Sequence, residues 1–152
     1  STQLSDTWEY ATSSPALFAI GGTGCAGSAG TPALSHEGYP WVNDSIEVVL
    51  GSLGTAPSIF IWGISDQTMS GVPLPLDLGL LGATGCTLYT SIDITVPVAQ
   101  PTAGEARWTI PIPEMYLLAG LEFYIQGMAM DSSANSLGWI TSDYGSATIG
   151  VR

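Results

Sequence analysis

Apolar and polar residues alternate along most of this chain, which is the pattern of β-strands with one buried face. Between Cys86 and Val98 every even position except Thr90 is apolar, and the odd positions are mostly polar. Residues 106–112 alternate in the same way, and "AQPTAG" separates the two segments. We predict one bent strand or two strands over 86–98, joined to 106–112 as a hairpin.

Six further segments have strand character: residues 45–50, 58–64, 74–80, 121–130, 137–141 and 147–151. The segment "SIFIWGI" (58–64) is apolar on both faces, which is typical of a central strand covered on both sides. Only "PEMYLLAG" (113–120) has helical character, for about two turns. Together these elements predict an all-β fold, a two-sheet antiparallel β-sandwich or jelly roll with at most one short helix.

A chain of 152 residues suits one domain, which we expect to span residues 21–152. In residues 1–20 the apolar Leu4, Trp8 and Tyr10 all stand at even positions, as on one face of a strand. Asp6 is the polar exception at an even position. Two interpretations fit this pattern. The segment is the first strand of its own sandwich, or it is an arm that adds to the sheet edge of a neighbouring copy and links subunits head to tail.

The segment "IGGTGCAGSAGTP" (20–32) has glycines at the Gly22-x-Gly24-x-x-Gly27 spacing of a dinucleotide-binding turn. That motif requires a helix after it, because the pyrophosphate sits on the helix N-terminus. The residues that follow, "SAGTP", disfavour a helix. We therefore expect these glycines to serve the backbone rather than a nucleotide.

The chain has two cysteines, Cys25 and Cys86, each preceded by glycine. A disulfide between them would fit an exported protein and would stabilise the fold by about 4 kcal/mol in the chain-entropy model. The alternative is two buried free thiols, and two cysteines are too few for a structural zinc site. A start at Ser1 without a methionine also predicts export with a cleaved signal peptide, although a start chosen for expression would look the same.

The charge balance is strongly acidic, with 13 acidic residues against Arg107 and Arg152 and a formal net charge of −11. Such a surface repels phosphate backbones and anionic headgroups, so we expect neither nucleic-acid nor membrane-surface partners. No apolar run reaches the roughly 18 residues of a membrane span, so we expect no membrane insertion. The lack of lysine also excludes Schiff-base chemistry.

Candidates for catalysis or metal binding are few. The one histidine, His36, lies among turn residues, and nothing singles out two of the 13 acids as a glycosidase pair, although such a pair stays an alternative. Calcium could find oxygen ligands in "DSSAN" (131–135) or "VNDS" (42–45), but Asp and Asn are also common turn formers. We expect no enzyme and no cofactor, with calcium as an open alternative.

Aromatic residues near expected loops support a second functional hypothesis. Trp41, Trp139 and Tyr144 could stack on sugar rings, as in a secreted carbohydrate-binding or adhesion module with a glycan partner. Trp62 and Trp108, in contrast, lie on apolar strand faces and are expected in the core.

Several motifs carry a resemblance: "GTGCAGSAGTP" (22–32), "LDLGLLGATGCTLY" (76–89), "WTIPIP" (108–113), "LLAGLEFYIQGMAMD" (117–131) and "ATIG" (147–150). Together they resemble an exported bacterial β-rich domain of uncharacterised activity, often found at the C-terminal end of large secreted or surface proteins. The resemblance covers roughly residues 22–152, and the two "GC" motifs are its most specific part. It implies a secreted, disulfide-bonded β-rich domain without catalytic residues.

The function that we expect is structural and non-enzymatic. The protein would be an extracellular or cell-surface subunit that assembles with copies of itself into a filament or surface layer. Leu4, Trp8 and Tyr10 would make the contacts of the donated arm.

Overall fold

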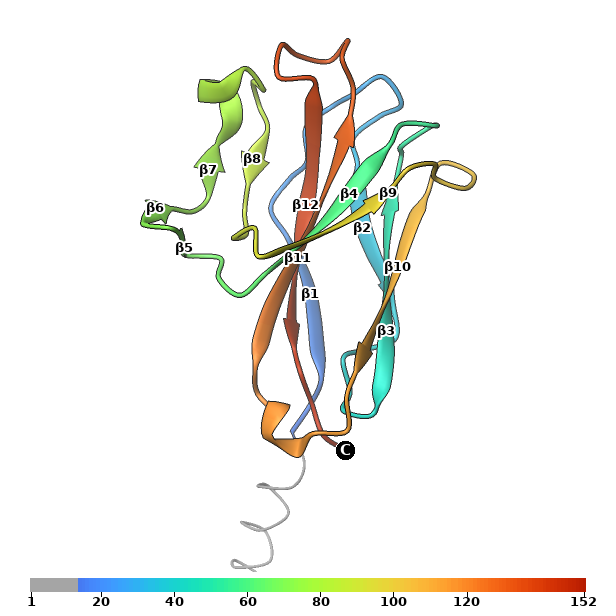
Figure 1. The fold of residues 1–152 in the computed structure, drawn as a ribbon, viewed down its shortest axis with the longest axis vertical. Helices are drawn as coiled ribbons and strands as arrows, with labels where there is room; N and C mark the ends of the chain where they lie inside the picture. The colour runs from blue at the N-terminus through green and yellow to red at the C-terminus, as the bar shows by residue number, and fades with distance from the viewer. Residues whose placement is uncertain (1–13) are drawn as a thin grey trace, which may run out of the picture.

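A computed structural model describes residues 14–152, which form two antiparallel β-sheets packed face to face (Figure 1). The larger sheet has the strand order β1-β12-β11-β4-β9, and the smaller has the order β10-β3-β2. The predicted all-β sandwich is therefore confirmed. Leu4, Trp8 and Tyr10 lie outside the described residues.

The larger sheet consists of β1 (Leu17–Gly21), β4 (Ser58–Gly63), β9 (Ile94–Val98), β11 (Glu122–Met130) and β12 (Trp139–Thr148). The smaller sheet consists of β2 (Ala33–Glu37), β3 (Asp44–Gly51) and β10 (Ala106–Ile112). Two short hairpins pair β5 (Thr68–Met69) with β6 (Val72–Pro73) and β7 (Leu76–Asp77) with β8 (Thr87–Leu88). Two 3₁₀ turns, η1 (Leu78–Leu81) and η2 (Tyr116–Leu118), are the helical elements of the described chain.

The core lies between the two sheets and follows the predicted alternation. Ile46, Val48 and Leu50 of β3 are fully buried, and Leu50 packs so closely on Gly127 of β11 that its side chain leaves no room for a Cβ there. Phe60 of β4 completes this layer from the larger sheet. Interdigitation of this kind is how aligned sheets reach the packing density of protein interiors.

Residues 64–93 form a partial third layer on the outer face of the larger sheet. Gln126 of β11 is fully buried beneath this layer and makes three hydrogen bonds, two of them to the layer and one to β12. Its Oε1 accepts from the backbone N–H of Tyr89 at 2.8 Å, and its Nε2 donates to the carbonyls of Thr87 and Ser142, each at 2.8 Å. The layer explains why the interior strand β4 is buried on both faces, as "SIFIWGI" predicted.

The predicted hairpin between 86–98 and 106–112 is wrong. β9 pairs with β4 in the larger sheet, whereas β10 pairs with β3 in the smaller one. The connection between them therefore crosses from sheet to sheet. A hairpin and such a crossing require the same alternation and the same turn residues, because each strand has one apolar face in both arrangements.

Other expected elements differ in extent. The segment 74–80 forms only the two-residue β7 before the chain turns into η1, where Asp77 accepts the backbone N–H of Gly79 at 2.8 Å. The segments 137–141 and 147–151 are not separate strands, because residues 139–141 and 147–148 are the two ends of one strand, β12. The helix expected over 113–120 is the single turn η2.

The N-terminal boundary also needs correction. β1 is an edge strand of the larger sheet, so a division at residue 20 falls inside that strand. Ser14 joins the same end of the sandwich through backbone hydrogen bonds with Val151, both of 2.8 Å. Any arm that stands apart from the sandwich is therefore confined to residues 1–13.

Candidate functional site

Cys25 and Cys86 form a disulfide, which settles the choice between paired and free thiols. Both are buried, and the bond links residues 61 apart in sequence. The backbone N–H of Thr141 on β12 donates to Cys25 Sγ at 3.2 Å. The disulfide therefore fixes the loop after β1 to the third layer, directly over β12. A disulfide is compatible with an oxidising compartment.

The glycines of the nucleotide-like motif are sites of close packing. A Cβ on Gly24 would lie 2.7 Å from the carbonyl oxygen of Pro32 and 2.9 Å from that of Thr141. Gly22 has a φ of +70°, and a Cβ there would lie 2.5 Å from the ring of Tyr89. No helix follows this loop, since the next element is β2. The motif brings backbone against backbone beside the disulfide.

The three candidate sugar-stacking residues do not form one surface. Trp41 pairs with Gly150 at one end of the sandwich, and the Arg152 guanidinium lies over its ring at 4.9 Å. Trp139 begins β12 at the other end, roughly 30 Å away at about 3.3 Å per residue. Tyr144 lies between them with one ring face stacked on Tyr89, at 4.9 Å between centroids.

The sequence analysis missed the tyrosine cluster around Tyr144. Tyr124 lies 6.5 Å from Tyr144 between ring centroids, and its hydroxyl donates to Glu122 at 2.9 Å. Burial, together with the hydrogen bond to Glu122, raises the pKa of Tyr124 to about 12. The Tyr89 hydroxyl accepts from the backbone N–H of Thr23 at 2.9 Å. These contacts hold the third layer and the β1 loop against the sheet, and only the tertiary fold brings them together.

Both loops considered for calcium use their carboxylates internally. Asp131 accepts from the backbone N–H of Ser28 at 2.6 Å and from the hydroxyl of Ser133 at 2.8 Å. The Ser28 N–H holds the pKa of Asp131 below its usual range. Asp44 accepts from Arg152 at 3.0 Å. Within residues 14–152, no three His, Cys, Asp or Glu side chains gather as a metal site would require.

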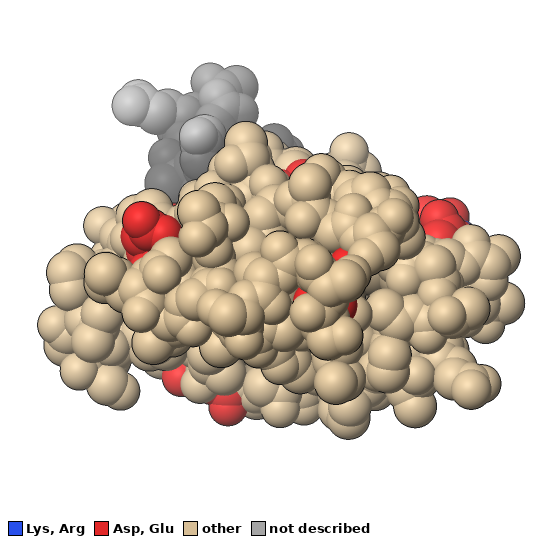
Figure 2. All heavy atoms as spheres, turned by 90° about the horizontal axis from the view of Figure 1, so that it is seen from above, with Lys and Arg blue, Asp and Glu red and all other residues tan. Residues whose placement is uncertain are grey.

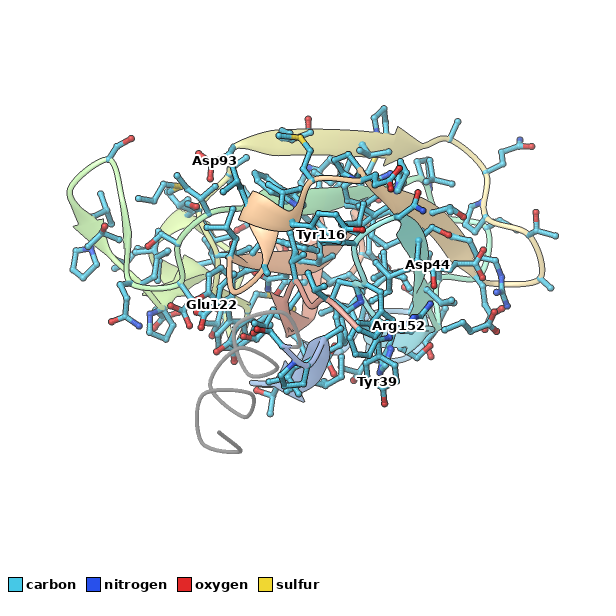
Figure 3. All side chains as sticks on the ribbon, turned by 90° about the horizontal axis from the view of Figure 1, so that it is seen from below. Tyr39, Asp44, Asp93, Tyr116, Glu122 and Arg152 are labelled. Atoms are coloured by element: carbon cyan, nitrogen blue, oxygen red, sulfur yellow. A yellow bond between two sulfur atoms is a disulfide. The ribbon has the colours of Figure 1, made fainter. Side chains whose placement is uncertain are left out.

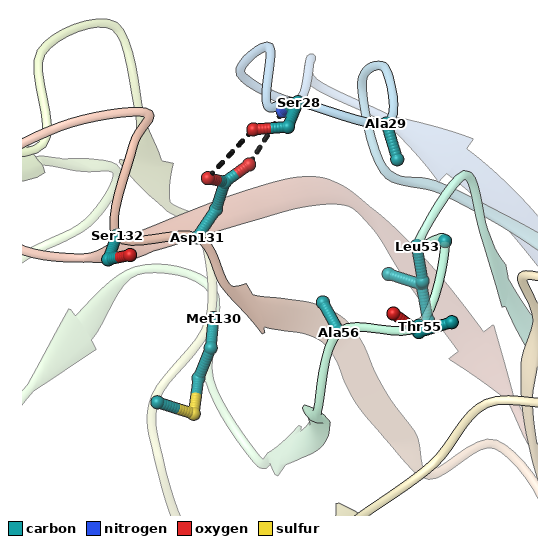
Figure 4. Close-up of a pocket in the computed structure, with 9 residues that line it drawn as sticks. Ser28, Ala29, Leu53, Thr55, Ala56, Met130, Asp131 and Ser132 are labelled. Carbon is teal, nitrogen blue, oxygen red and sulfur yellow. Dashed lines mark hydrogen bonds between the residues drawn. The ribbon is translucent and has the colours of Figure 1, made fainter.

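A hollow of about 420 Å³ lies beside Asp131, and Figure 4 shows its lining. The lining residues are Ser28, Ala29, Leu53, Gly54, Thr55, Ala56, Met130, Asp131 and Ser132. Most of them are small or apolar, and the Asp131 carboxylate points to Ser28 rather than into free space. The hollow therefore offers shape but few free polar groups.

His36 closes one lateral side of the sandwich, which we call the closed side. It lies on β2 rather than in the loop that the sequence suggested. Its ring packs on those of Phe18 of β1 and Tyr39, with centroids 4.5 and 5.2 Å away. Its Nδ1–H donates to the Gly38 carbonyl at 2.8 Å. Nearby, the backbone N–H of Leu34 donates to Asp143 at 2.8 Å.

The opposite lateral side, between the edge strands β9 and β10, is incompletely covered. Ile94 pairs with Trp62, which stacks on the buried Phe123, so Ile94 is on the inner face, yet it is 51% exposed. Val96 and Trp108 lie beside Phe60 in the same layer and are only half-buried. We call the surface formed by Trp62, Ile94, Val96 and Trp108 the open seam. A hollow of about 550 Å³ lies beside it at Val98, Ala106 and Arg107.

One end of the molecule carries a group of exposed apolar side chains. They lie on η2, at the start of β11 and at the start of β1, and Figure 3 views the molecule from this end. We call this group the apolar end: Leu17 (53% exposed), Met115 (51%), Tyr116 (67%), Leu117 (91%) and Leu121 (52%). Exposed apolar groups of this kind are typical of protein interaction sites. The chain enters the sandwich here, at Ser14.

The charged residues are spread over the surface. On the face shown in Figure 2, acidic atoms are scattered and no arginine is visible. Arg107 lies within 4 Å of three carboxylates, those of Glu37, Glu47 and Glu105, and Arg152 pairs with Asp44. Both arginines are therefore already neutralised by acidic neighbours.

None of the described helical elements is long and apolar enough to cross a membrane. A scan against models of known protein families finds no match, and a search of curated protein sequences finds no similar protein.

Proposed function

We propose that this protein is a non-enzymatic extracellular structural subunit that assembles with copies of itself through residues 1–13 and the apolar end. The observation that carries the proposal is the apolar end, where five large side chains are more than half exposed beside the point at which residue 14 enters the sandwich. Exposing this much apolar surface is unfavourable in a monomer, and contact between subunits would remove it from water.

The sequence of residues 1–13 adds a second argument. Leu4, Trp8 and Tyr10 share one parity, as they would on a strand with one face to bury. The chain's own larger sheet has β1 (Leu17–Gly21) as its first strand, and the proposal assigns residues 1–13 to a contact with a neighbouring copy. A head-to-tail contact repeats without closing and builds a filament or a layer.

Export is part of the proposal. The buried disulfide and the resemblance to exported bacterial domains both support an extracellular or cell-surface location. Outside the cell no reducing system would break the disulfide. The covalent link between the β1 loop and the third layer would therefore persist and hold the subunit together.

The proposal is tested by sedimentation velocity on full-length variants. Leu117→Ser and Trp8→Ser should each shift the protein from large assemblies toward monomers, because each removes an apolar contact between subunits. Val72→Ser is the matched control, since Val72 is also an exposed apolar residue but lies on the distant hairpin strand β6. The proposal fails if the unmodified chain is monomeric, or if all three variants assemble as it does.

A further inference from the structure

We infer that the open seam is the acceptor for residues 1–13 of a second copy, which add as a strand antiparallel to β10. The inference rests on the proposed function and specifies where the donated segment binds. The two large sheets of the described chain have four edge strands, namely β1, β2, β9 and β10.

The closed side is a poor acceptor. Phe18, His36 and Tyr39 pack against one another between β1 and β2 and cover much of this side, where Ile20 is the one inward-facing residue of β1 that is exposed, at 42%. The backbone N–H of Leu34 on β2 is already bonded to Asp143. The open seam leaves more inward-facing apolar surface in contact with solvent, because Ile94 is 51% exposed and Trp62, Val96 and Trp108 are each half-buried.

Within the open seam, β10 offers the longer edge, with seven residues against five in β9. Pro111 has no N–H, and a proline in an edge strand places its nitrogen on the unpaired side. By period two, the N–H and C=O groups of Arg107 and Thr109 face the same side. Glu105, two residues before Arg107, also directs its backbone N–H and C=O groups away from β3. These groups exchange hydrogen bonds of 2.9 and 3.1 Å with Thr102.

The side chains of the donated segment match the two faces of this site. A strand beside β10 that directs Trp8 toward Trp108 also directs Leu4 and Tyr10 into the open seam. In that register Glu9 lies on the outer face in contact with solvent, opposite Arg107, which already pairs with Glu47 and Glu105. The exception is Asp6, which stands at an even position like the apolar residues. Its side chain would therefore also point inward and bring a carboxylate to an apolar surface.

Strand direction determines the form of the assembly. β10 runs toward the apolar end, as Figure 1 shows, and Ser14 lies at that end of the donor. An antiparallel donor therefore leaves the acceptor at its far end, and the donor's own apolar end comes to rest there. Subunits would stack head to tail along the long axis, whereas a parallel donor would bring two apolar ends together in a closed pair.

The length of the segment is sufficient. Thirteen extended residues span roughly 43 Å at about 3.3 Å each, and a strand as long as β10 uses about 23 Å of this. With Trp8 beside Trp108, residues 4–10 lie along β10, and residues 11–13, which span roughly 10 Å when extended, connect one subunit to the next.

Cysteine crosslinking in the full-length protein tests the acceptor. Thr7→Cys with Thr109→Cys on β10 should give, under mild oxidation, a ladder of covalent multimers on a non-reducing gel. Thr7→Cys with Thr95→Cys on β9, or with Ala19→Cys on β1, are the matched controls and should give mainly uncrosslinked protein. The native disulfide is buried and common to all three variants.

The outcomes separate the inference from the proposed function. A ladder with β9 or β1 in place of β10 overturns the inference and leaves self-assembly standing. A crosslink within one chain also overturns it, because the segment then folds back onto its own β10. A ladder that stops at a dimer overturns it too, because two chains then exchange segments with each other. A chain that is monomeric by sedimentation and forms no crosslink with any partner position overturns the proposed function itself.

A second variant tests the parity of the donated strand. Asp6→Leu should lower the protein concentration needed for assembly by roughly tenfold or more, because it replaces an inward-facing carboxylate with an apolar side chain. Thr7→Leu, one residue along, points outward and should leave that concentration unchanged. An equal effect of the two substitutions would contradict a strand in the open seam.

Discussion

Gly22, Gly24 and Gly27 are required where other chain segments leave no room for a side chain. Their spacing matches a nucleotide-binding motif, yet their neighbours are Tyr89, the Thr141 carbonyl and Ile140. None of these neighbours is close in sequence. The sequence therefore identified a glycine-rich loop correctly, but the reason for it depends on contacts that only the folded chain creates.

The close approach at Gly24 predicts a large effect of a single methyl group. Gly24→Ala should lower the free energy of unfolding by about 2 kcal/mol or more, because the new Cβ meets two backbone carbonyls that cannot move independently. Gly51→Ala is the control, since its nearest contact would be 3.9 Å away. Urea unfolding measures both variants, and equal stabilities would contradict this account of the motif.

Asp131 predicts part of the pH dependence of stability. The Ser28 N–H lowers the pKa of this carboxyl, so its contribution to stability is present above pH of about 4 and is lost as the pH falls through the lowered pKa. Asp131→Asn does not titrate. We expect it to be less stable than the original chain at pH 7, with a smaller further loss between pH 4 and 2, as followed by thermal unfolding. Parallel pH profiles would contradict this role.

The strands could be predicted from the sequence to a much greater extent than their partners. Alternation located β3, β4, β10 and β11 to within two residues, because a strand buried on one face has to follow period two. Alternation carries no information about which strand lies alongside. For this reason β9 and β10 were expected in one hairpin, and the layer over Gln126 was not expected.

Gln126 predicts how strongly the third layer is held. Gln126→Leu leaves the Tyr89 N–H and two carbonyls without partners, and we expect a loss of about 3 kcal/mol or more in urea unfolding. The matched control is Ser58→Ala, which removes a buried hydroxyl that has no hydrogen-bond partner among the described residues. That variant should be as stable as the original chain or more stable by about 1 kcal/mol. If both substitutions are neutral, the layer is held by other contacts.

At the scale of the whole molecule, two surfaces distinguish this sandwich from a self-contained one. The open seam lies along one lateral side and the apolar end lies where the chain enters. Neither surface could be predicted from the sequence, because Trp108 and Ile94 follow the pattern of core residues and Leu117 follows that of a short helix. Exposure became evident only once strand order was known.

Net charge predicts the salt dependence of assembly. Each subunit carries a formal charge of −11, so subunits repel one another at low ionic strength. Raising NaCl from about 10 mM to about 1 M shortens the Debye length from about 30 Å to about 3 Å, and light scattering should then show more assembly. Assembly that weakens with salt would indicate contacts dominated by ion pairs, contrary to the apolar contacts proposed.

The central claim, assembly through residues 1–13, is tested most directly by negative-stain electron microscopy of the full chain beside a chain lacking residues 1–12. Circular dichroism and an intact Cys25–Cys86 disulfide would establish that the shortened chain is folded. We predict filaments or ordered layers from the full chain and single domains from the shortened one. Filaments from the shortened chain, or single domains from both, would contradict the account.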